Sequence, residues 1–449
     1  MRSDWAEVQT IGELLAREGG SIKTGPFGTA LKASEYADVG VPLISVREIG
    51  HGTFHIDRKT PRICNATLAR LPEYILQEGD IVFARKGGIE RCALIRKPQS
   101  GWFLGSDGIR LRPPTACDAR FIAYSLQTNA VKDWLVQNST GSTMASLNQA
   151  TIGRLPIALP AIWEQKRIAD VLEAFDDRIA LLREINATLE AIAQALFKSW
   201  FVDFDPVHAR ARGEHPAGMA PEVAPLFPDS FEESALGLVP NGWRWRTMDD
   251  VSTVGIGKTP PRKEPQWFSE NLDDVPWVSI KDMGTAGVFI NKTSEFLTPA
   301  SIDRFNVRVV PDNTVLLSFK LTVGRLSITD GEMVTNEEIA HFKLGEDSPL
   351  SSAYIYLALR QFNFESLSST SSIAEAVNSK TVRAIPILVP SPSLVAMFND
   401  HANPIFERIK LLEKQAQTLA NLRDTLLPRL ISGQLRLPEG DAMLQDAGI

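Results

Sequence analysis

The residues best suited to chemistry in this sequence are two matching sets of lysines and arginines. At an interval of 234 residues, Lys86 aligns with Lys320. Arg91 aligns with Arg325 at the same interval, and both pairs lie near strand ends or glycine-containing loops. Such side chains bind nucleic-acid phosphates, and arginine also binds the edge of guanine through two hydrogen bonds. The alternative, ordinary solvated surface charge, stays open for each member. The candidate DNA-binding residues are Lys23, Lys32, Arg47, Arg85, Lys86, Arg91, Lys258, Arg262, Lys263, Lys281, Lys320 and Arg325.

The patterns that indicate a catalytic site do not occur in the sequence. It has no GxxxxGK[ST] phosphate loop, no HExxH, no Asp/Asn-Pro-Pro-aromatic loop and no PD…(D/E)xK nuclease pattern. The six histidines show no metal spacing, and the three cysteines fit neither a zinc site nor a disulfide framework. His51 and His55 are four residues apart, but Gly52 between them favours a structural or surface role. We therefore predict no catalytic residue, no metal site and no cofactor bound by this chain.

Composition predicts a folded protein with more than one domain. The chain has 449 residues, a length that exceeds what a single hydrophobic core can hold. Of these residues, 44% are hydrophobic and 22% are charged, as in a folded protein. Its net charge of −7 argues against bulk attraction to nucleic acid or membranes. Charge is uneven, however: residues 1–160 have 19 Lys and Arg against 15 Asp and Glu, and residues 161–240 have 7 against 14. The N-terminus lacks an apolar signal segment, and no long apolar stretch follows. We expect a cytoplasmic protein without membrane association.

An internal repeat organises the chain. "PLISVREIG" (42–50) matches "PWVSIKDMG" (276–284) position by position. Later, "LPIALP" (155–160) matches "IPILVP" (385–390) at an interval of 230, so a net deletion of four residues lies between them. Each half therefore repeats one plan: many short strands, a proline-bounded strand and a long helical segment.

The repeated "RE" and "KD" pairs have two interpretations. If the segment is a strand throughout, Glu48 points to the face opposite Arg47, and Asp282 to the face opposite Lys281. The acids then do not neutralise the bases. Because the two copies are so alike, we interpret this segment as scaffold. We expect specificity where the halves differ, such as 51–70 against 285–304.

Heptad spacing predicts two long helices that pack against each other. Neither Pro nor Gly occurs from Trp163 to Phe204. In the second copy Pro404 predicts a helix start or kink. Forty helical residues extend about 60 Å. The predicted spacer seam consists of Ile168, Leu172, Phe175, Ile179, Leu182, Leu189, Leu196, Ile405, Ile409, Leu412, Leu419 and Leu426.

The predicted fold class is α+β, with a pseudo-twofold internal repeat. It comprises two strand-rich domains and two long helices packed as an intramolecular antiparallel coiled coil. The segment rich in Pro, Ala and Glu is interpreted as an extended linker. The predicted boundaries are 1–160 (first strand-rich domain), 161–204 (first helical spacer), 205–240 (linker), 241–390 (second strand-rich domain), 391–435 (second helical spacer) and 436–449 (tail).

Several segments in this order resemble the specificity subunit of type I restriction–modification systems. They are "GPFGTALKASEY" (25–36), "SLNQATIGRLPIALPAIWEQKRIADVL" (146–172), "ALFKSWFVDFDPV" (195–207), "GKTPPRKEPQWF" (257–268), "TVGRLSI" (322–328) and "LRDTLLPRLISGQL" (422–435). The resemblance spans nearly the whole chain. It departs at one point: Glu164 and Gln165 carry the family's Glu-Gln pair, whereas Leu394 and Val395 occupy the equivalent positions.

The resemblance implies the function. Each strand-rich domain is expected to be a target-recognition domain that reads half of a bipartite, asymmetric double-stranded DNA site. The coiled coil is expected to set the half-site spacing and to bind two modification subunits, which are adenine methyltransferases that carry S-adenosylmethionine. Restriction subunits for translocation and cleavage are further possible partners. The family's specificity subunit has no catalytic residues. The alternative, motivated by the net charge, is a coiled-coil protein scaffold that does not bind DNA.

Overall fold

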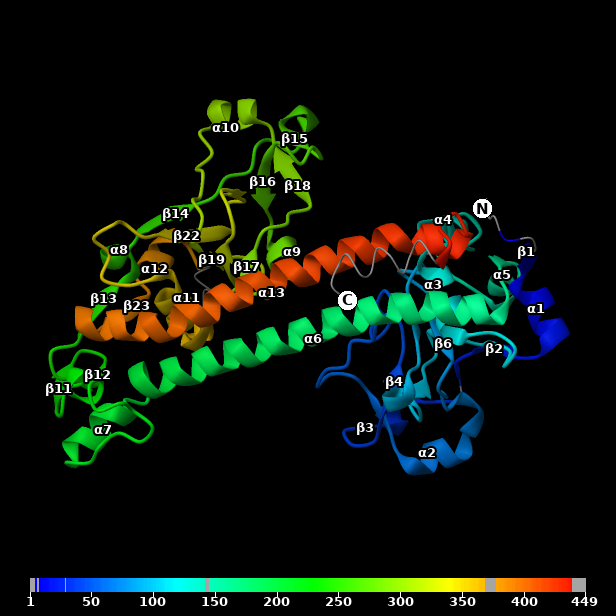
Figure 1. Ribbon diagram of the computed structural model, residues 1–449, viewed down its shortest axis with the longest axis horizontal. Coiled ribbons are helices and arrows are strands. Elements are labelled where there is room, and N and C mark those ends of the chain that lie inside the picture. Colours follow the sequence, from blue (N-terminus) through cyan, green and yellow to red (C-terminus); the bar gives the residue numbers. More distant parts are fainter. Residues whose placement is uncertain (1–4, 6–7, 29, 142–144, 368–376, 438–449) are drawn as a thin grey trace. The chain divides into compact units, whose positions relative to one another are not determined.

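The computed structural model describes the chain except for residues 1–4, 6–7, 29, 142–144, 368–376 and 438–449 (Figure 1). Most of the predicted tail, 436–449, therefore lies outside the described residues. The chain forms two compact units. One unit combines the chain up to Ala180 with the chain from Gln417 onward, and the other comprises Leu181–Ala416.

The first half of the chain contains, in order, β1 (Val8–Thr10), α1 (Ile11–Glu18), β2 (Ser21–Thr24), η1 (Ala33–Glu35), β3 (Tyr36–Ala37), β4 (Val41–Ile44), β5 (Arg62–Ile63), α2 (Asn65–Arg70), η2 (Pro72–Tyr74), β6 (Ile81–Ala84), β7 (Cys92–Leu94), η3 (Lys97–Gln99), β8 (Phe103–Leu104), β9 (Gly108–Arg112), α3 (Ala119–Gln127), α4 (Asn129–Gln137), α5 (Gln149–Gly153), β10 (Pro156–Ala158) and α6 (Ile162–Phe201). Its strands form a central antiparallel sheet of order β2-β9-β6-β7, a second sheet of order β3-β5-β4-β8 and the pair β1-β10.

The second half contains α7 (Asp205–Ala211), η4 (Ala224–Leu226), β11 (Phe231–Ser234), β12 (Gly237–Pro240), β13 (Arg244–Thr247), α8 (Met248–Val251), β14 (Thr253–Ile256), η5 (Pro265–Trp267), β15 (Phe268–Ser269), β16 (Val275–Val278), α9 (Ile280–Met283), β17 (Phe289–Ile290), β18 (Glu295–Leu297), α10 (Pro299–Phe305), β19 (Val315–Ser318), β20 (Leu326–Thr329), β21 (Val334–Thr335), β22 (Ile339–Lys343), α11 (Ser352–Gln361), η6 (Phe364–Leu367), α12 (Ser379–Arg383), β23 (Pro386–Val389) and α13 (Pro392–Ser432). Its sheets repeat the first plan as β14-β22-β19-β20-β17, β15-β18-β16-β21 and β13-β23. The internal repeat is therefore a repeat of strand pairing as well as of sequence.

The central strands β6 and β19 separate two apolar cores in each domain. Successive side chains of a strand point to opposite faces. Ile81 and Phe83 accordingly pack in one cluster with residues of α3, whereas Val82 and Ala84 pack in another with Ile44 of β4. The second domain repeats this arrangement around β19. A continuous apolar run such as Ile81–Ala84 is typical of a strand that is covered on both faces.

The long helices α6 and α13 pack antiparallel within each unit (Figure 1). In the first unit, Glu164 near the start of α6 pairs with Arg436 at 3.6 Å, and Asp176 farther along α6 pairs with Arg423 at 2.5 Å. In the second unit, the rings of Phe197 and Phe398 lie 5.8 Å apart. The predicted coiled-coil architecture is confirmed.

The expectation that a helix starts at Pro404 is wrong, because α13 runs without a break from Pro392 to Ser432. Pro404 lies on the exposed face of α13, and so does Asp400, whose carbonyl would have received the missing hydrogen bond. Water can solvate that carbonyl, so the proline is tolerated.

The expectation of an extended linker over 205–240 is also wrong. This segment forms α7, η4 and the β11-β12 hairpin. Val207, Phe227 and Val239 are buried in the core of the second unit, and the Phe227 ring lies 5.1 Å from that of Trp200. These apolar residues are spaced among the prolines, so the composition of the segment does not predict that they are buried.

Candidate nucleic-acid interface

In both domains the repeated segment ends in a turn that an acid caps by accepting the N–H of the serine three residues earlier. β16 ends at Val278, and the carboxylate of Asp282 accepts hydrogen bonds from the Ser279 N–H at 2.9 Å and from Ser279 Oγ at 2.6 Å. In the first domain Glu48 accepts from the Ser45 N–H at 3.2 Å. Glu48 and Asp282 are only 2% and 8% exposed. The expectation that the acids lie on a continuing strand is wrong, because each acid closes a turn three residues after its serine.

Asp282 therefore stabilises the fold, whereas its neighbour Lys281 is exposed. The other oxygen of the Asp282 carboxylate accepts the Ser294 N–H at 3.0 Å. We expect Asp282→Ala to lower the free energy of unfolding by about 2–3 kcal/mol, because buried N–H groups lose a charged acceptor. Lys281→Ala, as the matched control, changes it by less than about 0.5 kcal/mol. Urea denaturation measures both, and equal effects would contradict this assignment.

Arg91 and Arg325 hold the loops that follow β6 and β19. Arg91 donates to the carbonyl of Ile49 at 3.0 Å and to that of Gly87 at 2.7 Å. Arg325 donates to the carbonyl of Ile280 at 2.5 Å. Each guanidinium thus ties its loop to the capped turn of the same domain. These two candidates position the loops through their guanidinium groups.

Two candidates of the second domain are engaged within that domain. The Arg262 guanidinium lies 4.3 Å from the Phe268 ring centre and 4.5 Å from that of Trp277, and it binds Glu295 through two hydrogen bonds. Lys258 Nζ donates to the carbonyl of Phe305 at 2.5 Å. These groups organise the segment before β16.

Three candidates of the first domain take part in exposed ion pairs. Lys23 lies 4.0 Å from Glu73, Arg47 pairs with Asp57 at 2.5 Å, and Lys86 lies 3.8 Å from Asp107. Exposed pairs of this kind contribute at most about 1 kcal/mol. Phosphate can therefore replace the carboxylate partner at little cost.

The remaining candidates have exposed or half-exposed side chains. Arg85 lies 5.8 Å from the Phe27 ring centre, and Lys320 lies 5.4 Å from that of Phe319. For Lys32, Lys263 and Lys281, the described part of the chain shows no side-chain ion pair. The structure thus brings Arg85, Lys86 and Arg91 together in one loop of the first domain, and Lys320 and Arg325 in the equivalent loop of the second.

Two exposed apolar residues, Phe27 and Leu321, lie beside the basic candidates and are not predicted from charge alone. Phe27 is 65% exposed and lies beside Arg85. Leu321 is 87% exposed and follows Lys320 directly. The available signal was the repeat itself, since Leu321 aligns with Gly87 at the interval of 234 that aligns the flanking lysines.

The predicted spacer seam lies largely inside the two units. Ile168, Leu172, Phe175, Ile179, Leu182, Ile409, Leu412, Leu419 and Leu426 are buried, whereas Leu189, Leu196 and Ile405 are half-buried. Phe406 takes the buried place next to Ile405, so the seam shifts by one residue there. Gln165 is also buried: it donates to the carbonyl of Pro160 at 2.8 Å and accepts the N–H of Asp118 at 3.1 Å. This side chain joins the start of α6 to α3.

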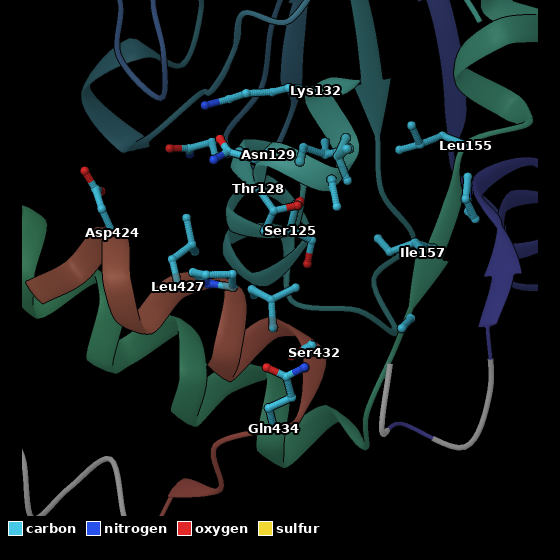
Figure 2. Close-up of a pocket in the computed structure, with 18 of the residues that line it drawn as sticks. Ser125, Thr128, Asn129, Lys132, Leu155, Ile157, Asp424, Leu427, Ser432 and Gln434 are labelled. Carbon is cyan, nitrogen blue, oxygen red and sulfur yellow. The ribbon is translucent and has the colours of Figure 1, made fainter. Parts of the chain in front are cut away.

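A pocket of about 540 Å³ lies in the first unit, between the junction of α3 with α4, β10 and the last turns of α13 (Figure 2). Leu427 and Ile157 contribute apolar walls, and Lys132 and Asp424 contribute charge. None of the twelve candidate DNA-binding residues lines it, so it is separate from the candidate interface.

Across the described residues, no group of three His, Cys, Asp or Glu side chains is placed to hold a metal ion. Nor does any helix within the described ranges combine the length and apolarity needed to cross a membrane.

The fold, with two strand-rich domains on antiparallel helices, agrees with the match to a known family. Residues 7–191 and 240–393 match the type I restriction modification DNA specificity domain. Because these matches cover more than half of the chain, the protein belongs to this family. The predicted resemblance is confirmed.

Individual relatives support the same assignment. The chain is 29% identical over 406 residues to the type I restriction enzyme HindI specificity subunit of Haemophilus influenzae, over 80% of this chain and 87% of that protein. It is 25% identical over 457 residues to the MjaIX specificity subunit of Methanocaldococcus jannaschii, over 97% and 94% of the two chains. The crystal structure of a type I restriction–modification S subunit from M. genitalium is similar in fold, with a TM-score of 0.53, 16% identity and coverage of 95% and 96%.

Proposed function

We propose that this chain reads a bipartite, asymmetric DNA sequence, with one half-site assigned to each strand-rich domain. The observation that carries the proposal is a repeated framework with different loop tips. The capped turn and the bracing arginine occur in both domains, whereas Gly87 in the first domain aligns in sequence with Leu321 in the second. Two domains that read different sequences must differ where they touch bases and can share everything else.

The helices α6 and α13 serve as the spacer between the half-sites. α6 has 40 residues, and a helix of this length extends about 60 Å. α6 contributes residues to both units, as does α13. Because two DNA-reading domains joined by rigid helices accept only a narrow range of distances between half-sites, the helices set that distance.

The chemistry belongs to partner subunits. Two adenine methyltransferase subunits bind the helical spacer, and S-adenosylmethionine binds to them and not to this chain. Where restriction subunits join the complex, they add translocation and cleavage. This chain supplies recognition without a catalytic residue of its own. Support comes from the lack of catalytic patterns in the sequence and from membership of the specificity family.

A domain exchange tests the half-site assignment. Residues 1–160 are replaced by the equivalent domain of another specificity subunit, and methylated adenines are mapped genome-wide in cells that carry the modification subunits. We expect one half of the methylated sequence to change, while the other half and the spacing persist. A change in both halves, or in neither, would contradict modular reading.

The alternative, a coiled-coil scaffold that does not bind DNA, predicts a different outcome. Under the proposal, the complex of this chain with its modification subunits binds a duplex with the mapped sequence, and its affinity falls steeply as salt rises, because bound phosphates release counterions. A scaffold would show no preference for that duplex over a scrambled one at any salt concentration.

A further inference from the structure

The loop after β19 presents a leucine in an unusual backbone conformation. Leu321 has φ of 55°, and the Thr322 N–H donates to the carbonyl of Lys320 at 2.6 Å. This bond between residues two apart makes Leu321 the centre of a γ-turn. The left-handed region suits glycine and is strained for leucine. The side chain is 87% exposed, so packing within its own domain does not compensate for this strain.

The loop is fixed by its own hydrogen bonds. Ser318 Oγ donates to the carbonyl of Thr322 at 2.5 Å and accepts the Arg325 N–H at 3.0 Å. The Gly324 N–H donates to the carbonyl of Ser318 at 2.9 Å. A Cβ on Gly324 would lie 3.1 Å from the Phe364 ring, so this side of the turn is closely packed. The loop thus presents Leu321 on a preorganised support.

The other domain shows what this position looks like without the side chain. Gly87 aligns with Leu321 and has the same φ of 55°. The lysine before it and the bracing arginine after it are retained as Lys86 and Arg91. The tip residue therefore has the same φ in both domains, and at this position only the second domain carries an exposed apolar side chain.

DNA fits this tip better than a protein partner does. A modification subunit that binds twice should meet equivalent surfaces in both halves, but the halves differ here. Two domains that read different half-sites should differ at the loop tip, where bases are contacted, and both should retain basic residues beside the tip for phosphate. Lys320 supplies such a flank, and the half-exposed Val323 adds a second apolar group to the same turn.

We propose that Leu321 is a wedge that inserts between stacked base pairs of the half-site read by the second domain, with Lys320 on an adjacent phosphate. This inference rests on the proposed DNA-reading function. Proteins that insert apolar side chains between base steps unstack the bases and bend the duplex. Bases that unstack easily are favoured at the insertion point, so Leu321 contributes specificity through DNA deformability.

The test uses the complex of the full chain with its modification subunits and the duplex identified by adenine mapping. 2-Aminopurine, whose fluorescence rises when it unstacks, replaces single bases along the second half-site. With the unsubstituted chain, we expect a rise at one base step. With Leu321→Gly, the rise disappears and the Kd increases about 10- to 100-fold, because a leucine no longer leaves water on binding.

Matched variants separate the wedge from misfolding. Leu321→Gly gives the second tip the residue found in the first, so its melting temperature should equal or exceed that of the unsubstituted chain. Leu321→Asn, which tolerates the left-handed conformation but is polar, should also lose the fluorescence rise. Lys320→Ala should keep the rise while the salt dependence of binding becomes shallower by about one counterion.

The possible outcomes distinguish failure of the wedge from failure of the proposed half-site reading. If the unsubstituted complex binds its mapped duplex but no base step responds, or if Leu321→Gly binds equally well, the wedge is overturned and half-site reading stands. If Leu321→Gly instead loses its modification subunits, Leu321 is a protein contact and the wedge is overturned. If the unsubstituted complex shows no preference for the mapped duplex, both proposals fail.

Discussion

Replacing Arg120 by alanine should lower the free energy of unfolding of the first unit by about 3 kcal/mol. The Arg120 guanidinium donates at 2.7 Å to each of three carboxylates, Asp118 beside α3 and Asp170 and Glu173 on α6. These hydrogen bonds, above all the one that Arg120 donates to Asp118, raise the pKa of Arg120 above its ordinary value. Without the arginine, the three carboxylates lie close together with one cation fewer to neutralise them. Each hydrogen bond between charged groups contributes about 1.5–3 kcal/mol to stability.

Arg120 also links the first strand-rich domain to the long helix α6. Its loss should therefore weaken the attachment of α3 to α6 as well as the ion network. Chemical denaturation followed by tryptophan fluorescence measures the change. Arg47→Ala, which removes an exposed ion pair in the same unit, should cost less than about 1 kcal/mol. Similar losses in the two variants would show that the Arg120 network does not bear on stability.

The second unit should become less stable as pH rises from about 4.5 to 7, because of Glu413. Its carboxyl oxygens accept the N–H groups of Val288 at 2.9 Å and Phe289 at 3.1 Å, which ties α13 to β17. Burial, with a smaller contribution from Glu190 and Asp330, raises the pKa of Glu413 to about 7.

The sign of the effect follows from which state holds the proton. In that pH window the folded chain keeps Glu413 protonated, whereas the unfolded chain has released the proton. Stability is therefore fully present below pH 4.5 and is lost as pH rises through 7, by up to about 3 kcal/mol.

Glu413→Gln isolates this contribution, since the amide cannot ionise. The difference in unfolding free energy between the variant and the unsubstituted chain should shift in favour of the variant as pH rises from 4.5 to 8. Glu407→Gln, on an exposed position of the same helix, should show no such shift. Denaturation curves at several pH values give both differences. A constant difference for Glu413→Gln would mean that Glu413 is ionised in the folded state throughout.

Much of the architecture follows from patterns that are local or periodic. The heptad spacing predicts both helices, because a stripe of apolar residues must be buried whatever else surrounds it. The interval of 234 residues predicts the paired domains, because aligned apolar runs such as those of β6 and β19 build the same sheet. Asn148 and Asn378, aligned at an interval of 230, cap α5 and α12 through equivalent hydrogen bonds.

Other features depended on distant partners and were missed. The sequence does not predict the role of Glu48 and Asp282, because a capping turn and a strand end use the same residue types and only the strand boundary separates them. The prolines of residues 205–240 predict an extended linker, but Val207 and Phe227 pack into a core made of residues far along the chain.

The sequence by itself determined the repeat, the two long helices and the resemblance to the type I restriction–modification specificity family. It also supplied the set of basic candidates. Only the tertiary structure decided which of them are engaged within their own domain, as Arg91, Arg262 and Arg325 are, and which have exposed side chains, as Lys281 and Lys320 do. The physical reason is that a lysine or an arginine carries the same charge wherever it lies in the sequence. Its use depends on whether a carbonyl, a carboxylate or solvent lies within reach, and the fold alone sets that distance.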